Sequence, residues 1–267
     1  MVKRLVFFLF ATLSFNLCAG KKITVPGDAR TIKAGLEKAE AGDTVFVRKG
    51  IYKEHITLKD EVVLLGESTA ETIIKGSSRN PVVIGADNAV IKFFTVKDGE
   101  KGILCANNSM TIEHNLICNN LGSGVHCLVT LPVIRNNILY QNGWSGIYCE
   151  TVRSMRGRIE NNLLMENSNS GIMLAGKSEV LVQNNVFLHN KQYGIWVNEG
   201  AKRSRIVFND FYMNRDVASR FAQIDKTNFG ADPQYDFEGS PAAMFEKPSE
   251  PLKQRGKDNK DIGILAE

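Results

Sequence analysis

The chain has 267 residues, of which 43% are hydrophobic and 23% charged, and this ordinary balance excludes a disordered or coiled-coil protein. Its formal net charge is +4, which falls to +2 when Lys3 and Arg4 are removed. A chain so close to neutral lacks the basic surface that binds nucleic acid, so we expect no nucleic-acid partner.

Residues 1–20 have the three parts of a secretory signal peptide. Two basic residues precede an almost wholly apolar run from Leu5 to Leu17, and small residues follow. We expect cleavage after Ala19 or Gly20 and a secreted or periplasmic mature protein. Because the apolar run is short for a membrane span and no later segment approaches that length, no membrane insertion is predicted after cleavage.

Residues 21–42 are expected to form an N-terminal cap, made of a strand and an amphipathic helix. Thr31 is a suitable N-cap residue, Ile32 and Leu36 share one face of the predicted helix, and Gly42 ends it. A helix in this position would cover the open end of a solenoid.

Residues 43–230 contain a repeat of 22 to 25 residues. A glycine followed by Ile or Val recurs in one column, at Gly102, Gly124, Gly146, Gly171 and Gly194. Two asparagine columns share this register, one of Asn115, Asn137, Asn162, Asn185 and Asn209, the other of Asn120, Asn142, Asn167, Asn190 and Asn214. The copies are short and β-branched, which excludes two-helix repeats. Leucine-rich repeats remain the rival interpretation, although they need a leucine framework and one asparagine per copy.

These columns predict an all-β fold, a single right-handed parallel β-helix (a solenoid) of about eight coils. Stacked coils place equivalent residues above one another at about 4.8 Å. Asparagine tolerates the left-handed backbone of a sharp corner, and stacked amides bond to one another along a ladder. We therefore expect both asparagine columns at the corners of the coils.

Four cysteines follow the predicted leader. Cys105, Cys127 and Cys149 fall in one inward-facing column, where cysteine acts as a small buried hydrophobic residue. Free thiols are the favoured prediction for this column. A disulfide between neighbouring coils is the alternative, and the redox state of Cys118 is open.

One outward column carries the candidate site. The residue after each inward Ile or Val gives Leu104, His126, Tyr148, Met173 and Trp196. Aromatic rings beside hydrogen-bonding groups suit sugars, so the candidate substrate-binding residues are Tyr148, Met173, Trp196 and Asn198. His126 and Glu150 are the titratable pair on this face and the candidate catalytic base and acid. The alternative is that the rings merely stack for strand stability.

A second outward column alternates in charge and is predicted to be a solvated sheet face: Glu113, Arg135, Glu160 and Gln183. The histidines never pair at metal-ligand spacing, so neither a metal site nor a cofactor is expected: His55, His114, His126 and His189. After Gly230 the repeat stops, and residues 231–267 are expected to form a C-terminal capping segment and polar tail over the far end of the rod.

Segments near both ends of the mature chain resemble the pectate-lyase-like β-helix superfamily, in its bacterial secreted form. They are Thr31 to Leu36, Gly42 to Val47, Lys49 to Glu54, Leu64 to Glu67, Asp232-Pro233, Ser240 to Ala242 and Asp261 to Gly263. The resemblance implies a right-handed β-helix and, for many members, action on polysaccharides. The segments that carry catalysis in pectin esterases, alginate epimerases and polygalacturonases are absent, so no catalytic residue transfers from them.

The sequence therefore predicts an exported β-helix protein that binds or modifies a polysaccharide along the outward aromatic column. A non-catalytic periplasmic or cell-surface scaffold is the alternative. It is favoured by coil lengths that vary by three residues or fewer, without the long loops of lyases and hydrolases. The sequence leaves the oligomeric state and any calcium dependence open.

Overall fold

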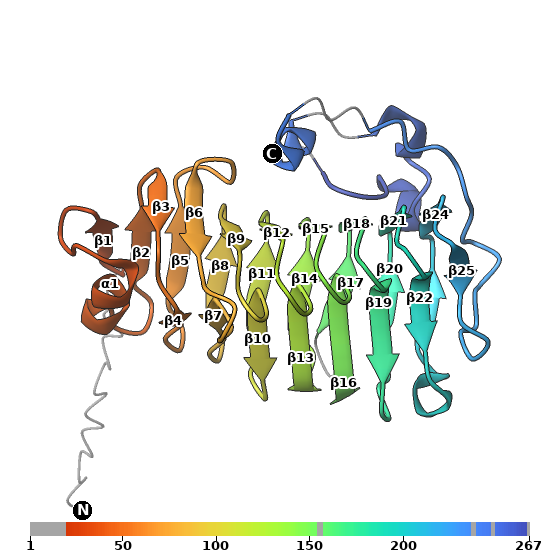
Figure 1. The fold of residues 1–267 in the computed structure, drawn as a ribbon, viewed down its shortest axis with the longest axis horizontal. Coiled ribbons are helices and arrows are strands. Elements are labelled where there is room, and N and C mark those ends of the chain that lie inside the picture. The colour runs from red at the N-terminus through yellow and green to blue at the C-terminus, as the bar shows by residue number, and fades with distance from the viewer. Residues whose placement is uncertain (1–19, 154–156, 236–238, 247–248, 266–267) are drawn as a thin grey trace, which may run out of the picture.

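The computed structural model describes residues 20–153, 157–235, 239–246 and 249–265. The chain winds into an elongated parallel β-helix whose coils each add one strand to three sheets (Figure 1). Among the described residues these sheets, here called A, B and C, contain nine, eight and eight strands, which confirms the predicted solenoid. Apart from Gly20, the predicted signal peptide lies outside the described residues.

All strand pairs within the three sheets are parallel, and each sheet runs the length of the rod. Sheet A consists of β1 (Lys22–Val25), β2 (Thr44–Val47), β5 (Val63–Gly66), β8 (Val90–Lys92), β11 (Thr111–Glu113), β14 (Val133–Arg135), β17 (Arg158–Glu160), β20 (Leu181–Gln183) and β23 (Arg205–Val207). Sheet B consists of β3 (Gly50–Tyr52), β6 (Thr72–Lys75), β9 (Thr95–Lys97), β12 (Leu116–Cys118), β15 (Ile138–Tyr140), β18 (Leu163–Met165), β21 (Val186–Leu188) and β24 (Asp210–Tyr212). Sheet C consists of β4 (Ile56–Thr57), β7 (Val83–Ile84), β10 (Ile103–Ala106), β13 (Val125–Thr130), β16 (Ile147–Arg153), β19 (Ser170–Ala175), β22 (Tyr193–Val197) and β25 (Asp216–Ala218).

The predicted N-terminal helix is present as α1 (Ile32–Lys38), at the end of the rod. Thr31 caps it, since its Oγ1 accepts the Ala34 N–H at 3.1 Å. The helix ends before the predicted glycine because Ala39 already has extended backbone angles. No helix in the described part of the chain is long and apolar enough to cross a membrane.

Both asparagine columns form the expected ladders at the corners. In the ladder between sheets A and B, each Nδ2 donates to the Oδ1 of the next coil at 3.0 to 3.2 Å. The left-handed backbone, however, belongs to the residue before each ladder asparagine: Asn136 precedes Asn137 with φ 54° and Asn161 precedes Asn162 with φ 53°. The ladder asparagines therefore contribute their amide groups, and the expectation that they take the left-handed conformation is wrong.

The core is filled by the inward residues of each coil. Cys105, Cys127 and Cys149 are fully buried and free, as the favoured prediction has it. The repeated glycine is explained by close contact between coils, because a Cβ on Gly146 would lie 2.8 Å from the carbonyl oxygen of Gly171. Any larger residue in this column would push neighbouring coils apart.

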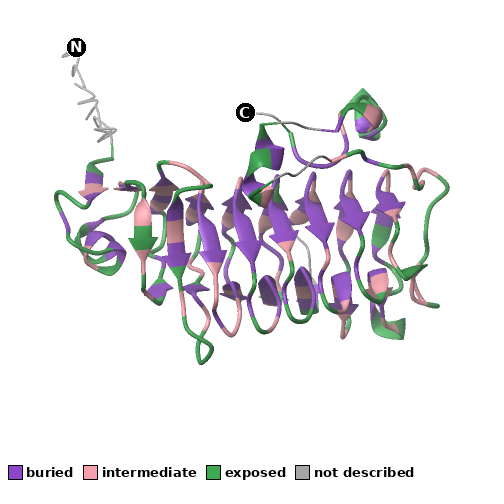
Figure 2. Ribbon diagram, turned by 45° about the horizontal axis from the view of Figure 1, so that its top comes forward, coloured by how far each residue is buried: buried purple, intermediate pink, exposed green. Residues whose placement is uncertain are grey.

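The described residues of the C-terminal segment, 231–235, 239–246 and 249–265, turn back along the rod (Figure 1). The segment contains short 3-10 helices at Pro241–Phe245, Glu250–Leu252 and Lys257–Asn259. Its apolar side chains bury the outward residues of sheet B, giving a second core of Leu116, Cys118, Ile138, Leu163, Met165, Val186, Leu188, Ala242, Met244, Phe245, Leu252, Ile262 and Ile264. Figure 2 shows this buried surface along the strands beneath the segment. Sheet C lies outside this second core.

Candidate functional site

The outward column of sheet C has the register that the repeat predicted. His126 pairs with Tyr148, Tyr148 with Met173, and Met173 with Trp196 on successive strands. The glycine and inward Ile or Val that open each strand set this register, because side chains alternate between the two faces. Tyr148, Met173 and Trp196 are each half-buried, so all three present part of their surface to solvent.

His126, Tyr148 and Glu150 form one cluster on this face. The His126 and Tyr148 rings stack with centroids 4.7 Å apart and planes at 28°. The His126 Nε2 lies 3.5 Å from the Glu150 Oε2. Burial lowers the pKa of His126, the Lys101 charge lowers it further, and Glu150 opposes both effects. The imidazole is therefore neutral at pH 7 and has the protonation state that a general base needs.

The two members of this pair differ in access. His126 is only 9% exposed, and both of its ring nitrogens are enclosed, with Glu150 as the neighbour of Nε2. The Glu150 side chain is 48% exposed. A bound ligand would thus reach the Glu150 carboxylate directly, whereas His126 is enclosed and stacks against the Tyr148 ring.

The remaining predicted site residues are less closely joined. Met173 separates Tyr148 from Trp196, so the aromatic rings do not make a continuous ladder. Asn198 follows β22, and its Oδ1 accepts the Ala201 N–H at 2.9 Å to cap a short 3-10 helix at Glu199–Ala201. That oxygen is already engaged within the chain, so Asn198 has less capacity for a ligand than its place in the sequence suggested.

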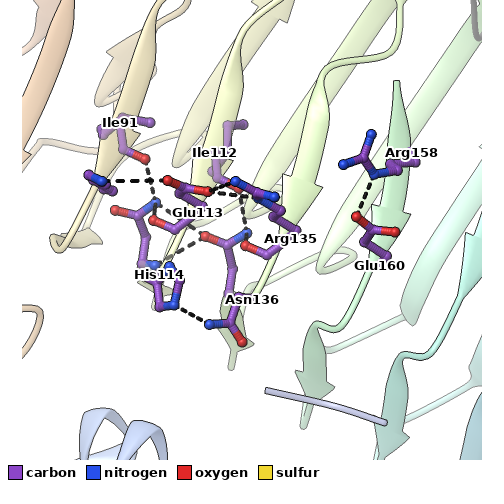
Figure 3. A network of polar contacts seen from close by, with 11 residues as sticks. Ile91, Ile112, Glu113, His114, Arg135, Asn136, Arg158 and Glu160 are labelled. Atoms are coloured by element: carbon purple, nitrogen blue, oxygen red, sulfur yellow. Dashed lines mark hydrogen bonds and ion pairs between the residues drawn. The ribbon is translucent and has the colours of Figure 1, made fainter. Parts of the chain in front are cut away.

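A cleft of about 670 Å³ lies on another side of the rod, between sheet A and the C-terminal segment. Its floor is the charged column of sheet A, and Lys257, Asp258, Lys260 and Leu265 form the opposite wall. Arg135 donates its Nε to Glu113 Oε2 at 2.7 Å, and Arg158 donates its Nε to Glu160 (Figure 3). Within the alternating column Glu113 pairs with Arg135, whereas Glu160 pairs with Arg158 of its own strand, and the column lines the cleft.

Asparagines at the corner beside this cleft hold the C-terminal segment. Asn136 exchanges hydrogen bonds with the backbone of Leu265 at 2.5 and 3.2 Å. Asn161 Nδ2 donates to the carbonyls of Asp261 and Gly263 at 2.9 and 3.0 Å. Asn184 Oδ1 accepts the Lys257 N–H at 3.0 Å. These side chains fix one wall of the cleft to the rod.

Metal binding gains no support from side-chain grouping. Among the described residues, no cluster of three or more His, Cys, Asp or Glu could hold a metal ion.

A family model described as the right handed beta helix region matches residues 80–225, more than half of the chain. The chain belongs to this right-handed β-helix family. Among solved structures, this β-helix is similar to an alginate lyase from Paenibacillus sp. str. FPU-7, with 12% identity and a TM-score of 0.48 over 79% of this chain and 98% of that one. It is also similar to the Agl-KA catalytic domain, with 15% identity and a TM-score of 0.45 over 74% of this chain and 48% of that one. No curated protein matches the chain.

The cleft of this β-helix protein was missed by sequence reasoning, although the sequence holds one signal for it. Strands of sheet B are apolar at outward as well as inward positions, as in Leu116–Cys118 and Leu163–Met165. A strand with one solvated face would alternate apolar and polar residues. The pattern therefore indicates a cover over sheet B, and the edge of that cover encloses the cleft.

Proposed function

We propose that this right-handed β-helix protein binds a polysaccharide chain along the outward face of sheet C. The observation that supports this most is the cluster in which the Tyr148 ring is stacked on a buried histidine beside the exposed Glu150 carboxylate. The exposed part of the Tyr148 ring offers an apolar contact to a sugar, and a carboxylate accepts hydrogen bonds from its hydroxyl groups. Export, expected from the first twenty residues, would bring the protein to such polymers.

The spacing of the rings suits a chain along the rod. Tyr148 and Trp196 are two coils apart, or about 10 Å at the usual separation of strands. The coil spacing is similar to the length of one sugar unit, so the two rings would contact sugars two units apart. Met173 between them provides a polarisable apolar contact.

Acid–base catalysis by His126 and Glu150 is a second candidate function. It is favoured by their 3.5 Å contact and by the lowered pKa of His126. Because the ring nitrogens are enclosed, proton transfer to a substrate would require neighbouring groups to move aside. Release of unsaturated or reducing sugar products by the wild-type chain would establish this activity.

Replacing Tyr148 and Trp196 together by alanine is expected to weaken polysaccharide binding roughly 10- to 100-fold, because the stacking surface for two sugars is lost. Binding would be measured by calorimetry on the chain from Lys21, with pectate, alginate, glycosaminoglycans and neutral cell-wall glycans, each with and without calcium.

Trp144→Ala is the matched control, since Trp144 is exposed but precedes β16 at the corner between sheets B and C. It should change the affinity less than about twofold. Equal affinities of the double variant and the wild type would refute the assignment of this face. Absence of binding to every glycan would refute the proposed function and favour the non-catalytic scaffold.

A further inference from the structure

We propose that the cleft between sheet A and the C-terminal segment binds the acidic groups of an anionic sugar chain, at a site separate from the face of sheet C. The cleft spans β11, β14, β17 and β20, and its polar walls come from the floor of sheet A and from the end of the chain. This second site does not depend on the function proposed for sheet C.

The floor presents positive charge because its carboxylates are mostly buried, whereas its guanidinium groups are more exposed to solvent. The Glu113 and Glu160 side chains are only 12% and 17% exposed, whereas those of Arg135 and Arg158 are 44% and 39% exposed. Each carboxylate is already bound by the neighbouring guanidinium (Figure 3). Glu113 also faces Lys92 at 3.7 Å, and Glu160 Oε2 accepts the Gln183 amide at 3.0 Å. A ligand in the cleft therefore meets the arginines before it meets the acids.

The opposite wall adds two further cations. Lys257 and Lys260 line the cleft, and within the described part of the chain neither forms an ion pair. Asp258 is the acid that lies between them in the sequence. Two of the three carboxylates that line the cleft, those of Glu113 and Glu160, are already bound by arginines of the floor. The cleft therefore retains an excess of accessible positive charge. Guanidinium and ammonium groups bind carboxylate and sulfate through short charge-assisted hydrogen bonds.

The size and openness of the cleft favour a chain over a single small ion. Four successive strands cover about 14 Å at the usual strand separation, and the volume is about 670 Å³. Arg135 and Arg158 lie on adjacent coils and are offset by two residues along their strands, since Arg135 pairs with Glu160, so the two charges lie at different points along the cleft. Because Asn136, Asn161 and Asn184 fix the far wall, little conformational entropy is lost when a ligand binds.

The test is calorimetric titration of the chain from Lys21 with four ligands at low and at physiological salt. These are a uronate tetrasaccharide, a sulfated tetrasaccharide, a neutral tetrasaccharide and inorganic phosphate. The double variant Arg158→Gln with Lys260→Gln should bind an acidic tetrasaccharide about tenfold more weakly and should show a weaker salt dependence. Its affinity for the neutral tetrasaccharide should not change. The two acidic ligands show whether carboxylate or sulfate is the preferred group.

Arg205→Gln with Lys226→Gln is the matched control, because it removes the same charge from exposed positions outside the cleft. It should bind acidic ligands within about twofold of the wild type. The proposal is overturned if the cleft variant binds them as the wild type does, or if phosphate binds as tightly as the tetrasaccharides. It is also overturned if Tyr148→Ala with Trp196→Ala, and not the cleft variant, abolishes acidic binding, a result that would leave the function proposed for sheet C intact. Equal melting temperatures of all variants ensure that binding alone is compared.

Discussion

Replacing Asn162 by alanine is expected to lower the free energy of unfolding by roughly 3–5 kcal/mol. Asn162 is fully buried in the middle of the ladder between sheets A and B. Its Nδ2 donates to the Ile134 and Glu160 carbonyls and to Asn185 Oδ1 at 2.9 to 3.0 Å. Its Oδ1 accepts both the backbone and the side-chain N–H groups of Asn137 at 3.0 Å. The alanine would remove all of these bonds from the buried interior. The Asn137 backbone N–H would lose its acceptor, whereas Asn185 Oδ1 would keep the backbone N–H of residue 162.

Urea unfolding followed by circular dichroism would measure this loss. Asn228→Ala is the matched control, since Asn228 ends the same ladder and is only half-buried. Water can replace its bonds, so the control should cost about 1 kcal/mol. Equal losses for the two variants would show that the buried amides are not what stabilises the ladder.

Replacing Asp210 by asparagine is expected to stabilise the protein at pH 7 by up to about 3 kcal/mol. Asp210 is completely buried where the last coil meets the C-terminal segment. Its Oδ1 accepts the Ala231 N–H at 2.7 Å, whereas its Oδ2 is enclosed without a partner. Burial raises the pKa of Asp210 to about 6, with the charges of Arg255 and Asp232 acting in opposite directions. Asparagine keeps the bond to Ala231 and removes the buried charge.

The sign of the pH dependence follows from the raised pKa. In the unfolded chain Asp210 ionises near 3.8, so the cost of burying its charge appears as the pH rises from about 4 to 6 and stays constant above. Wild-type stability should fall over this window, and Asp210→Asn should flatten the fall. Asp225→Asn is the control of opposite sign, because hydrogen bonds from Thr227 lower the pKa of Asp225. The hydrogen-exchange protection of the Ala231 amide, compared at pH 4.5 and 7.5, would show whether the change in stability arises at the Asp210 site. If the stability of Asp210→Asn depended on pH as the wild type does, the assignment of this pH dependence to Asp210 would be wrong.

The coils could be predicted from the sequence because each position of the repeat has one structural role. The glycine column, the inward Ile or Val and the two asparagine columns recur on five successive coils, and together they set the register that places His126 beside Tyr148 and Glu150. Repetition makes such a prediction robust, since an error at one coil would be visible at the next. The enclosure of His126 was not predictable, because it depends on how its neighbours pack.

The C-terminal segment was harder to place because it is not part of the repeat. Met244, Leu252 and Ile262 follow no repeat spacing, yet all three are buried in the second core against sheet B. Nothing within the segment itself indicates which of the three sheets they contact, and the signal lies instead in the apolar outward positions of sheet B. The cleft shares this difficulty, since Lys257 and Arg158 both line it although they are distant along the chain.

The asparagines that anchor the C-terminal segment relate the length of that segment to the number of coils in the rod. Asn136, Asn161 and Asn184 occupy successive coils, and they hold Leu265, Asp261 and Lys257, which follow one another at intervals of four residues. One coil therefore corresponds to four residues of the segment. Adding or deleting a whole coil between β14 and β20 would preserve the stacking of the solenoid but place every later anchor one step out of register. Variation in coil number is thus compatible with this architecture at the N-terminal end, ahead of Asn136, or where the final segment changes in length by the same step.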